Sequence, residues 1–139
     1  MSPPGFDPAV DETIDCDARA PAIARRAVGE LSADVDPAVI RDAQLLVSEV
    51  VTNSIKHSGS DDPIHLRVWE RSTGLKIEVA DGGFGFEPAE PTDPGVGEGG
   101  RGLLILEALA DRWGTTYDAR ARVWFELSPR PVSGSLRAG

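Results

Sequence analysis

The stretch LLVSEVVTNSIKHSG, residues 45–59, belongs to the longest helical pattern of the chain. Its apolar residues recur at the three- and four-residue spacing of an amphipathic helix. Asp36 suits an N-cap, Pro37 suits the first helical position, and Gly59 stands where a helix terminator is expected. The sequence therefore predicts a helix from Pro37 to about His57.

Two polar side chains of this helix raise a question of chemistry. Glu49 and Asn53 are four residues apart, which at ~100° per residue places them about 40° apart, at the border of the apolar arc. Lys56 and His57 continue the same edge one turn later. Taken alone, such an edge is the wetted border of an amphipathic helix, and a single histidine there is a structural residue more often than a ligand or base.

The rest of the chain supplies strands that this helix can cover. A helix is expected near residues 17–31, with Ile23 and Val28 on its apolar face, and another near residues 103–112. Alternating apolar residues predict strands in two hairpins, with a short additional strand near the N-terminus. The expected strand ranges are 10–14, 64–70, 75–81, 113–117 and 122–127. This order predicts an α+β two-layer sandwich, with a mixed, mostly antiparallel sheet and helices on one face.

Size and charge limit the function. The 139 residues suit one domain, expected at 14–128 between a flexible segment 1–13 and a disordered tail 129–139. No stretch is long and apolar enough to span a bilayer, and a net charge of −9 argues against nucleic acid or an anionic membrane as the main partner. The single Cys16 and the absence of a secretory signal favour the cytoplasm.

Two glycine-rich segments border the region from Gly82 to Gly102, which has no periodicity. Asp81 ends a predicted strand, and Gly83 and Gly85 follow it in DGGFGF, where the backbone can turn sharply and approach a ligand. The second segment, GVGEGGRGLLILE, leads into the predicted helix near 103–112, whose N-terminus would favour a phosphate. Neither a Rossmann fingerprint after a strand nor a Walker lysine is present.

The three segments SEVVTNSIKH, DGGFGF and GEGGRGLLILEALAD, in this order, resemble the N, G1 and G2 boxes of the GHKL ATPase superfamily (gyrase, histidine kinase and MutL type). The chain is most similar to the small bacterial anti-sigma-factor serine/threonine kinases, in their actinobacterial form. The resemblance extends from about Ile14 to Leu127 and implies the Bergerat ATP-binding fold. ATP and Mg²⁺ are the ligands that it implies.

The resemblance assigns roles to individual residues. Asn53 matches the asparagine that coordinates Mg²⁺, and Glu49 matches the carboxylate proposed as general base toward the attacking hydroxyl or water. Asp81 matches the aspartate that accepts a hydrogen bond from the adenine amino group. The other matching positions are the adjoining glycines Gly83 and Gly85, the lid glycines Gly100 and Gly102, the lid residue Arg101, and the phosphate-side or helix-end residues Lys56 and His57.

The resemblance also implies an activity and partners. The expected function is to sequester a sigma factor and to phosphorylate a serine or threonine of a STAS-type anti-sigma antagonist, as a homodimer. The chain has two histidines, one in the N box and one in a predicted strand, so the phosphoacceptor helix pair of membrane histidine kinases is missing. The alternative is a non-catalytic, ATP-dependent regulatory binding protein of the same fold. Glu49 favours the kinase, because a protein that only binds needs no base.

Overall fold

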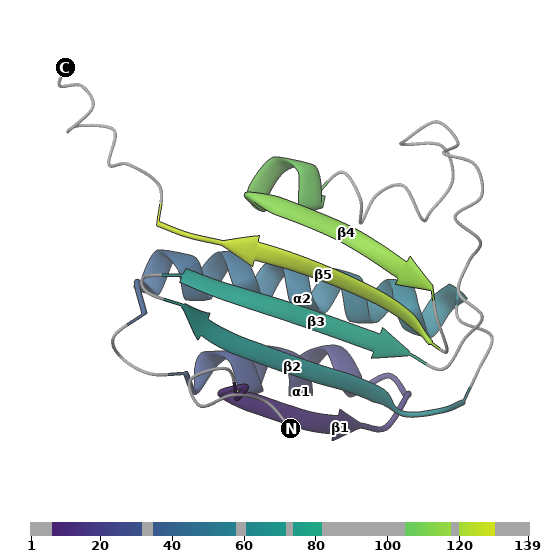
Figure 1. The fold of residues 1–139 in the computed structure, drawn as a ribbon. Helices are drawn as coiled ribbons and strands as arrows, with labels where there is room; N and C mark the ends of the chain where they lie inside the picture. Colours follow the sequence, from purple (N-terminus) through teal and green to yellow (C-terminus); the bar gives the residue numbers. More distant parts are fainter. Residues whose placement is uncertain are drawn as a thin grey trace, which may run out of the picture.

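The protein forms two layers, a sheet of five strands and a pair of helices that cover one of its faces (Figure 1). The computed structural model describes residues 7–31, 35–57, 61–71, 74–81, 105–117 and 120–129. The expected α+β two-layer sandwich with helices on one face is confirmed. Among the described helices, none is both long and apolar enough to cross a bilayer.

The sheet has the strand order β1-β2-β3-β5-β4. The strands are β1 (Val10–Ile14), β2 (Ile64–Arg71), β3 (Gly74–Asp81), β4 (Arg112–Tyr117) and β5 (Ala121–Leu127). Every pairing among these strands is antiparallel, so the sheet is simpler than the mixed one expected. Residues 10–14 pair with β2 along their whole length. The ordered sheet therefore begins at Val10, before the domain boundary expected at residue 14.

The core lies between the sheet and the helices. The alternation within β2 and β3 points every second side chain toward the helices, as the period of a strand requires. These side chains are almost fully removed from water, and a strip of α2 (Pro37–His57) packs over them. The buried strand residues include Leu66, Val68, Ile77, Val79 and Phe125.

Helix α2 starts where the sequence predicts. The Asp36 carboxylate accepts a hydrogen bond from the backbone N–H of Ala38 at 2.8 Å, and its carbonyl accepts from Val39 at 2.9 Å. The cap satisfies N–H groups that have no partner within the helix, while Pro37 has no N–H to satisfy. The fully helical stretch reaches His57, the expected end.

Helix α1 (Ala20–Gly29) is shorter than expected and is turned differently about its axis. Its buried side chains are Ala20, Ala24 and Val28, whereas Ile23 is 37% exposed. The expected apolar face is thus confirmed at Val28, and Ala27 and Leu31 pack against the core, but the position expected for Ile23 is wrong. Small residues at four-residue spacing face α2, because they let the two helices pack closely.

A short helical segment, residues 105–109, precedes β4. Leu106 is buried in the core, and the indole N–H of Trp113 donates a hydrogen bond of 3.1 Å to the Glu107 carboxylate. The backbone N–H of Asp111 donates to the carbonyl of Glu126 at 2.8 Å. These contacts fix the segment to the outer strands.

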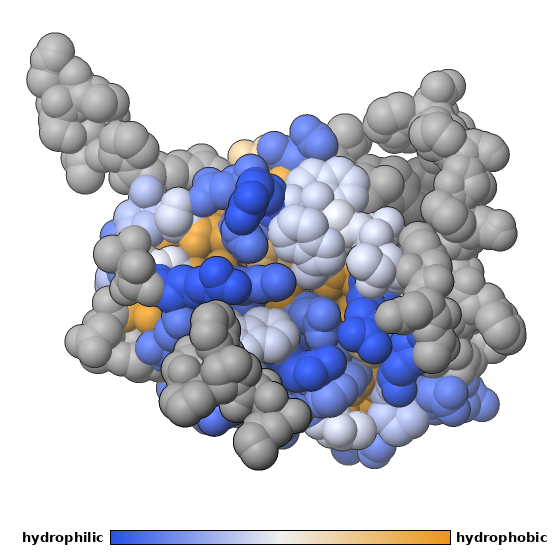
Figure 2. Space-filling view, in the orientation of Figure 1, coloured by the Kyte–Doolittle hydropathy of each residue, from blue (hydrophilic) through white to orange (hydrophobic). Residues whose placement is uncertain are grey.

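The opposite face of the sheet is not covered by either α1 or α2. Figure 2 looks onto this face and shows mostly hydrophilic side chains, with paler ones among them and little of the apolar core. One face of the sheet is thus packed against α1 and α2, whereas the other face is covered by neither helix.

Candidate functional site

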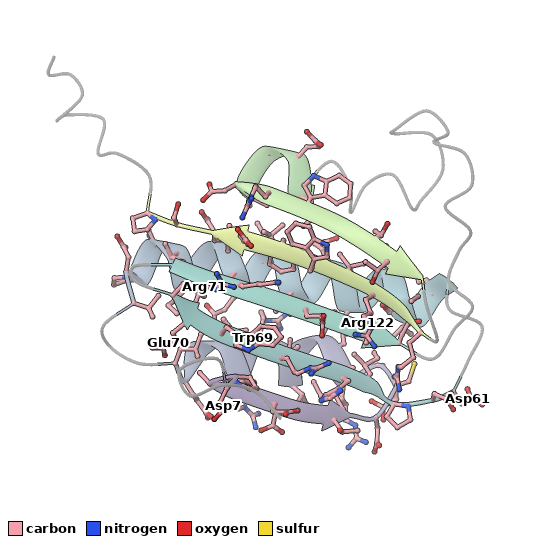
Figure 3. All side chains as sticks on the ribbon, viewed as in Figure 1. Asp7, Asp61, Trp69, Glu70, Arg71 and Arg122 are labelled. Carbon is pink, nitrogen blue, oxygen red and sulfur yellow. The ribbon has the colours of Figure 1, made fainter. Side chains whose placement is uncertain are left out.

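One edge of the sheet collects the residues that the sequence singled out. Because the strands are antiparallel, β1 and β3 end at the edge where β2 and β5 begin. In register, Ile14 faces Ile64, and Asp81 faces Ala121. Figure 3 places Asp61, just before β2, at this same edge. A residue that follows β1 or β3 in the sequence is therefore close to this edge.

The C-terminal end of α2 lies on the same side of the molecule (Figure 1). Only the six residues 58–63 separate His57 from Ile64 at the start of β2. Six residues span at most about 25 Å when fully extended, so the end of α2 must remain near this edge. The fold thus brings the polar edge of α2 and the end of β3 to one side.

Glu49 and Asn53 are both half-buried on α2, and Lys56 is exposed. Neighbouring residues on the inner side of α2 are buried: Leu46, Val47, Val50, Val51 and Ser54. The border position predicted for Glu49 and Asn53 is confirmed. Side chains at such a border can bind a ligand while the helix stays packed on the sheet. The His57 side chain lies outside the described part of the chain.

Asp81 is the last residue of β3 and is 8% exposed. It and Ser54 are the buried polar residues of the described chain. Removing a carboxylate from most of the solvent costs free energy unless its oxygens are hydrogen-bonded. The structure therefore places Asp81 at the end of a central strand, with its side chain largely removed from solvent.

Cys16 is a residue of this edge that the sequence analysis did not single out. Burial raises the pKa of its thiol, and the negative charges of Asp61, Asp81 and Asp17 raise it further. Cys16 follows β1 and Asp81 ends β3, so both lie at this end of the sheet. No local pattern of the sequence predicts that placement, because it arises from the order of the strands.

A hydrogen bond between distant segments joins the starts of β2 and β5 at this end of the sheet. Arg120, just before β5, donates a hydrogen bond of 2.9 Å from its guanidinium to the carbonyl oxygen of Pro63. Pro63 immediately precedes β2, which is two strands away from β5 in the sheet. The arginine therefore crosses over the end of β3, the strand that carries Asp81.

The side chains that could act as metal ligands limit how a metal ion can bind. Among the described residues, no group of three His, Cys, Asp or Glu side chains is arranged to hold a metal ion. Mg²⁺ often keeps several waters and binds through one or two protein ligands together with phosphate oxygens. A half-buried amide oxygen of Asn53 suits that kind of site, whereas an ion held by protein ligands alone would need more donors.

The remaining predicted site residues lie outside the described part of the chain. They are Gly83, Gly85, Gly100, Arg101 and Gly102. The described residues do form two hollows, both at the opposite end of the sheet from Asp81. One, of about 250 Å³, includes four carboxylates, from Asp11, Glu12, Glu30 and Glu70. Such a lining is unsuited to a nucleotide phosphate.

Comparison with known proteins agrees with this arrangement. Residues 15–125 match the family described as histidine kinase-like ATPase domain. An anti-sigma F factor of Clostridium botulinum (strain Eklund 17B / Type B) is 33% identical over 102 residues, which cover 65% of this chain and 71% of the relative. The serine-protein kinase RsbW of Oceanobacillus iheyensis is 31% identical over 87 residues, covering 52% of this chain and 54% of the relative.

Solved structures show the same fold. The histidine kinase domain of the Erythrobacter litoralis EL346 blue-light activated histidine kinase is 28% identical, with a TM-score of 0.51. The match covers 65% of this chain and 44% of that chain. A second structure of that kinase is 25% identical with a TM-score of 0.55, covering 78% of this chain and 39% of that one. The chain thus spans less than half of these two kinase structures.

Proposed function

The chain belongs to the histidine kinase-like ATPase domain family, and we propose that it is an ATP-binding anti-sigma-factor serine/threonine kinase. In this role it sequesters a sigma factor and transfers a phosphoryl group from ATP to an anti-sigma antagonist of the STAS type. The similarity to an anti-sigma F factor and to a serine-protein kinase supports both halves of this role. The site at the edge of the sheet supplies the chemistry.

The observation that supports the proposal is that α2, which carries Glu49 and Asn53, and β3, which carries Asp81, end on the same side of the fold. Asp81 accepts a hydrogen bond from the adenine amino group, which selects adenine over guanine. Asn53 contributes an amide oxygen to Mg²⁺, which when bound neutralises charge on the phosphates. Glu49, one helical turn from Asn53, accepts the proton of the incoming hydroxyl. Phosphoryl transfer needs mainly positioning and charge stabilisation, so these three roles account for most of the chemistry.

The glycine segments complete the proposed site. Gly83 and Gly85 allow the backbone to approach the nucleotide after Asp81. Gly100, Arg101 and Gly102 are proposed to lie beside the phosphates, where backbone N–H groups bind oxygen atoms well. Lys56, exposed near the end of α2, is a candidate for a phosphate contact.

The proposal includes the setting in which the kinase acts. We propose a homodimer in the cytoplasm that binds a sigma factor and its antagonist and has no direct contact with nucleic acid or membrane. The high negative charge of the chain supports the last part, because a polyanion would be repelled at most of the surface.

A transfer assay tests the function. The purified chain is incubated with γ-labelled ATP, Mg²⁺ and each small STAS-type protein of the same genome, purified separately. The kinase proposal expects label on a serine or threonine of one of them. If none is labelled, although ATP changes the affinity for a sigma factor or an antagonist, the protein is a non-catalytic regulator of the same fold. If ATP does not bind at all, both proposals are wrong.

A further inference from the structure

Arg120 connects two segments that are not neighbours in the sheet. Its guanidinium donates a hydrogen bond of 2.9 Å to the carbonyl oxygen of Pro63, 57 residues away in the sequence. Strand β3 pairs with β2 on one side and with β5 on the other, and its last residue, Asp81, pairs with Ala121. The side chain of Arg120 therefore spans the end of the strand that carries Asp81.

The Arg120 side chain is seated in the surface of the protein. The residue is half-buried, and its Nε atom is removed from water. The guanidinium is planar and holds its donors in a fixed arrangement, so a hydrogen bond from it restrains the acceptor. The side chain of Arg112, at the other end of the pairing between β4 and β5, is in contrast 71% exposed.

The acceptor of this hydrogen bond belongs to the connection between α2 and β2. Pro63 is the last residue of that connection, directly before Ile64 at the start of β2. Proline has no backbone N–H, so Pro63 cannot donate a hydrogen bond to a neighbouring strand. Its carbonyl oxygen is held by Arg120. The contact thus ties the end of the connection to the start of β5, across the end of β3.

This tie restrains the end of β3. Strand ends open locally more easily than the middle of a sheet, because fewer contacts hold them. With Pro63 bound to Arg120, the segments on the two sides of Asp81 cannot separate without breaking a further hydrogen bond. A side chain that is already held in place loses less conformational freedom when a ligand binds to it.

The position of Arg120 favours a role at the base of the nucleotide and not at the phosphates. Asp81, whose strand end it crosses, is the residue that the proposed function assigns to the adenine amino group. The proposed phosphate side involves Asn53, through Mg²⁺, and the glycine segment 100–102. An arginine that acts through the end of β3 should therefore affect the contact with adenine.

We propose that Arg120 is a positioning residue for Asp81: its hydrogen bond to Pro63 holds the end of β3 in the arrangement in which the carboxylate binds adenine. This role rests on the proposed function, because that function supplies the ligand. The restraint on the end of β3 is a property of the fold and can be measured without a nucleotide.

A double-mutant cycle with ATP tests the role. Arg120→Ala should weaken ATP binding, measured by calorimetry, by about tenfold. In the Asp81→Asn background the same change should have almost no further effect, because residues that act as a unit are not additive. An arginine that bound a phosphate directly would instead lower the affinity by the same factor in both backgrounds.

Two further variants show that the hydrogen bond is responsible. Arg120→Lys keeps a cationic donor on a long side chain and should recover most of the lost ATP affinity. Arg112→Ala is the matched control, since it removes an arginine from the exposed ion pair with Glu126, and should leave the affinity unchanged. The thermal midpoint of each variant, followed by circular dichroism, should stay within a few degrees of the parental value.

Hydrogen exchange tests the restraint in the absence of nucleotide. The backbone amides at the end of β3 should exchange about tenfold faster in Arg120→Ala and at close to the parental rate in Arg120→Lys. Parental exchange in Arg120→Ala, an additive cycle, or parental ATP affinity in Arg120→Ala would each overturn the role of Arg120 and leave the proposed function standing. A parent that binds no ATP would overturn the proposed function, while the exchange rates still show whether Arg120 restrains β3.

Discussion

The backbone of Gly74 passes so close to Leu127 that a Cβ at position 74 would overlap the Leu127 carbonyl oxygen. Gly74 is the buried first residue of β3, and Leu127 is the buried last residue of β5. The obstacle is the backbone of a neighbouring paired strand, which cannot rotate aside as a side chain could. The two strands can therefore pair in this register only with glycine at position 74.

Gly74→Ala should for this reason lower the free energy of unfolding by about 3 kcal/mol, at the upper end of overpacking effects. Gly114→Ala is the matched control, because the atoms it meets belong to the Trp124 indole, which can shift. We expect a cost of about 1 kcal/mol there. Urea unfolding followed by circular dichroism measures both, and an equal cost at the two positions would contradict the argument.

Asp81→Asn should weaken ATP binding strongly and leave the fold intact. An amide in place of the carboxylate presents an N–H₂ group to the adenine amino group, and a buried mismatched donor costs about 1–3 kcal/mol, or roughly 5- to 150-fold in affinity. Calorimetry with ATP and with GTP measures the effect. An unchanged ATP affinity in a folded variant would remove Asp81 from the site.

Cys16 gives a second, independent test of this edge. Its pKa is raised by burial and by the charges of Asp61, Asp81 and Asp17, so alkylation by iodoacetamide should reach half its limiting rate at a higher pH than for a free cysteine. Neutral Cys16 favours the folded state. The contribution of this thiol to the free energy of unfolding is complete below the pKa of the thiol in the unfolded chain. It is lost as the pH rises through the higher pKa of the thiol in the folded protein.

Asp81→Asn removes one of the three charges and should shift the alkylation midpoint to lower pH. Asp36→Asn, at the far end of α2, is the control and should not shift it. A midpoint that is the same in Asp81→Asn and in the parent would mean that the thiol and this carboxylate do not interact.

The sequence predicts the parts of this fold that depend on local periodicity. The inward residues of β2 and β3, such as Leu66 and Ile77, follow from alternation, and the start of α2 follows from Asp36 and Pro37. Periodicity predicted the burial of Val28 in α1, but it wrongly placed Ile23 on the buried face and did not single out Ala20 and Ala24. The choice of the buried face depends on packing against α2, where alanines allow a closer approach than Ile23 would.

Contacts between distant segments could not be predicted in this way. Cys16 and Asp81 lie at the same end of the sheet because β1, β2 and β3 are neighbours with alternating directions. Lys76 lies between Trp69 and Trp124 because β2 and β5 pair with the two sides of β3. Strand order and register are set by the whole core. The border position of Glu49 and Asn53 was predictable, because it requires only the geometry of one helix.

Asn53→Ala should remove the Mg²⁺ dependence of ATP binding. The side chain is half-buried at the edge of α2 and outside the core, so little packing is lost, and the thermal midpoint should change by only a few degrees. ATP titrations with Mg²⁺ and with EDTA measure the dependence. Thr52→Ala, the preceding residue, is the control. If the variant responds to Mg²⁺ as the parent does, Asn53 is not a metal ligand.

Glu49→Gln separates proton transfer from binding. Glutamine keeps the length and hydrogen-bonding reach of the side chain, but it cannot accept a proton at neutral pH. If Glu49 is the general base, the variant should bind Mg²⁺ and ATP with parental affinity, while phosphate transfer to the antagonist falls by roughly 10²–10⁴-fold. Single-turnover transfer with labelled ATP measures the chemical step apart from product release. The control is a double variant that combines Glu49→Gln with Gln44→Glu. It has a carboxylate elsewhere on α2, and that carboxylate should not restore phosphate transfer. Transfer at the parental rate in Glu49→Gln would show that the hydroxyl loses its proton to another group.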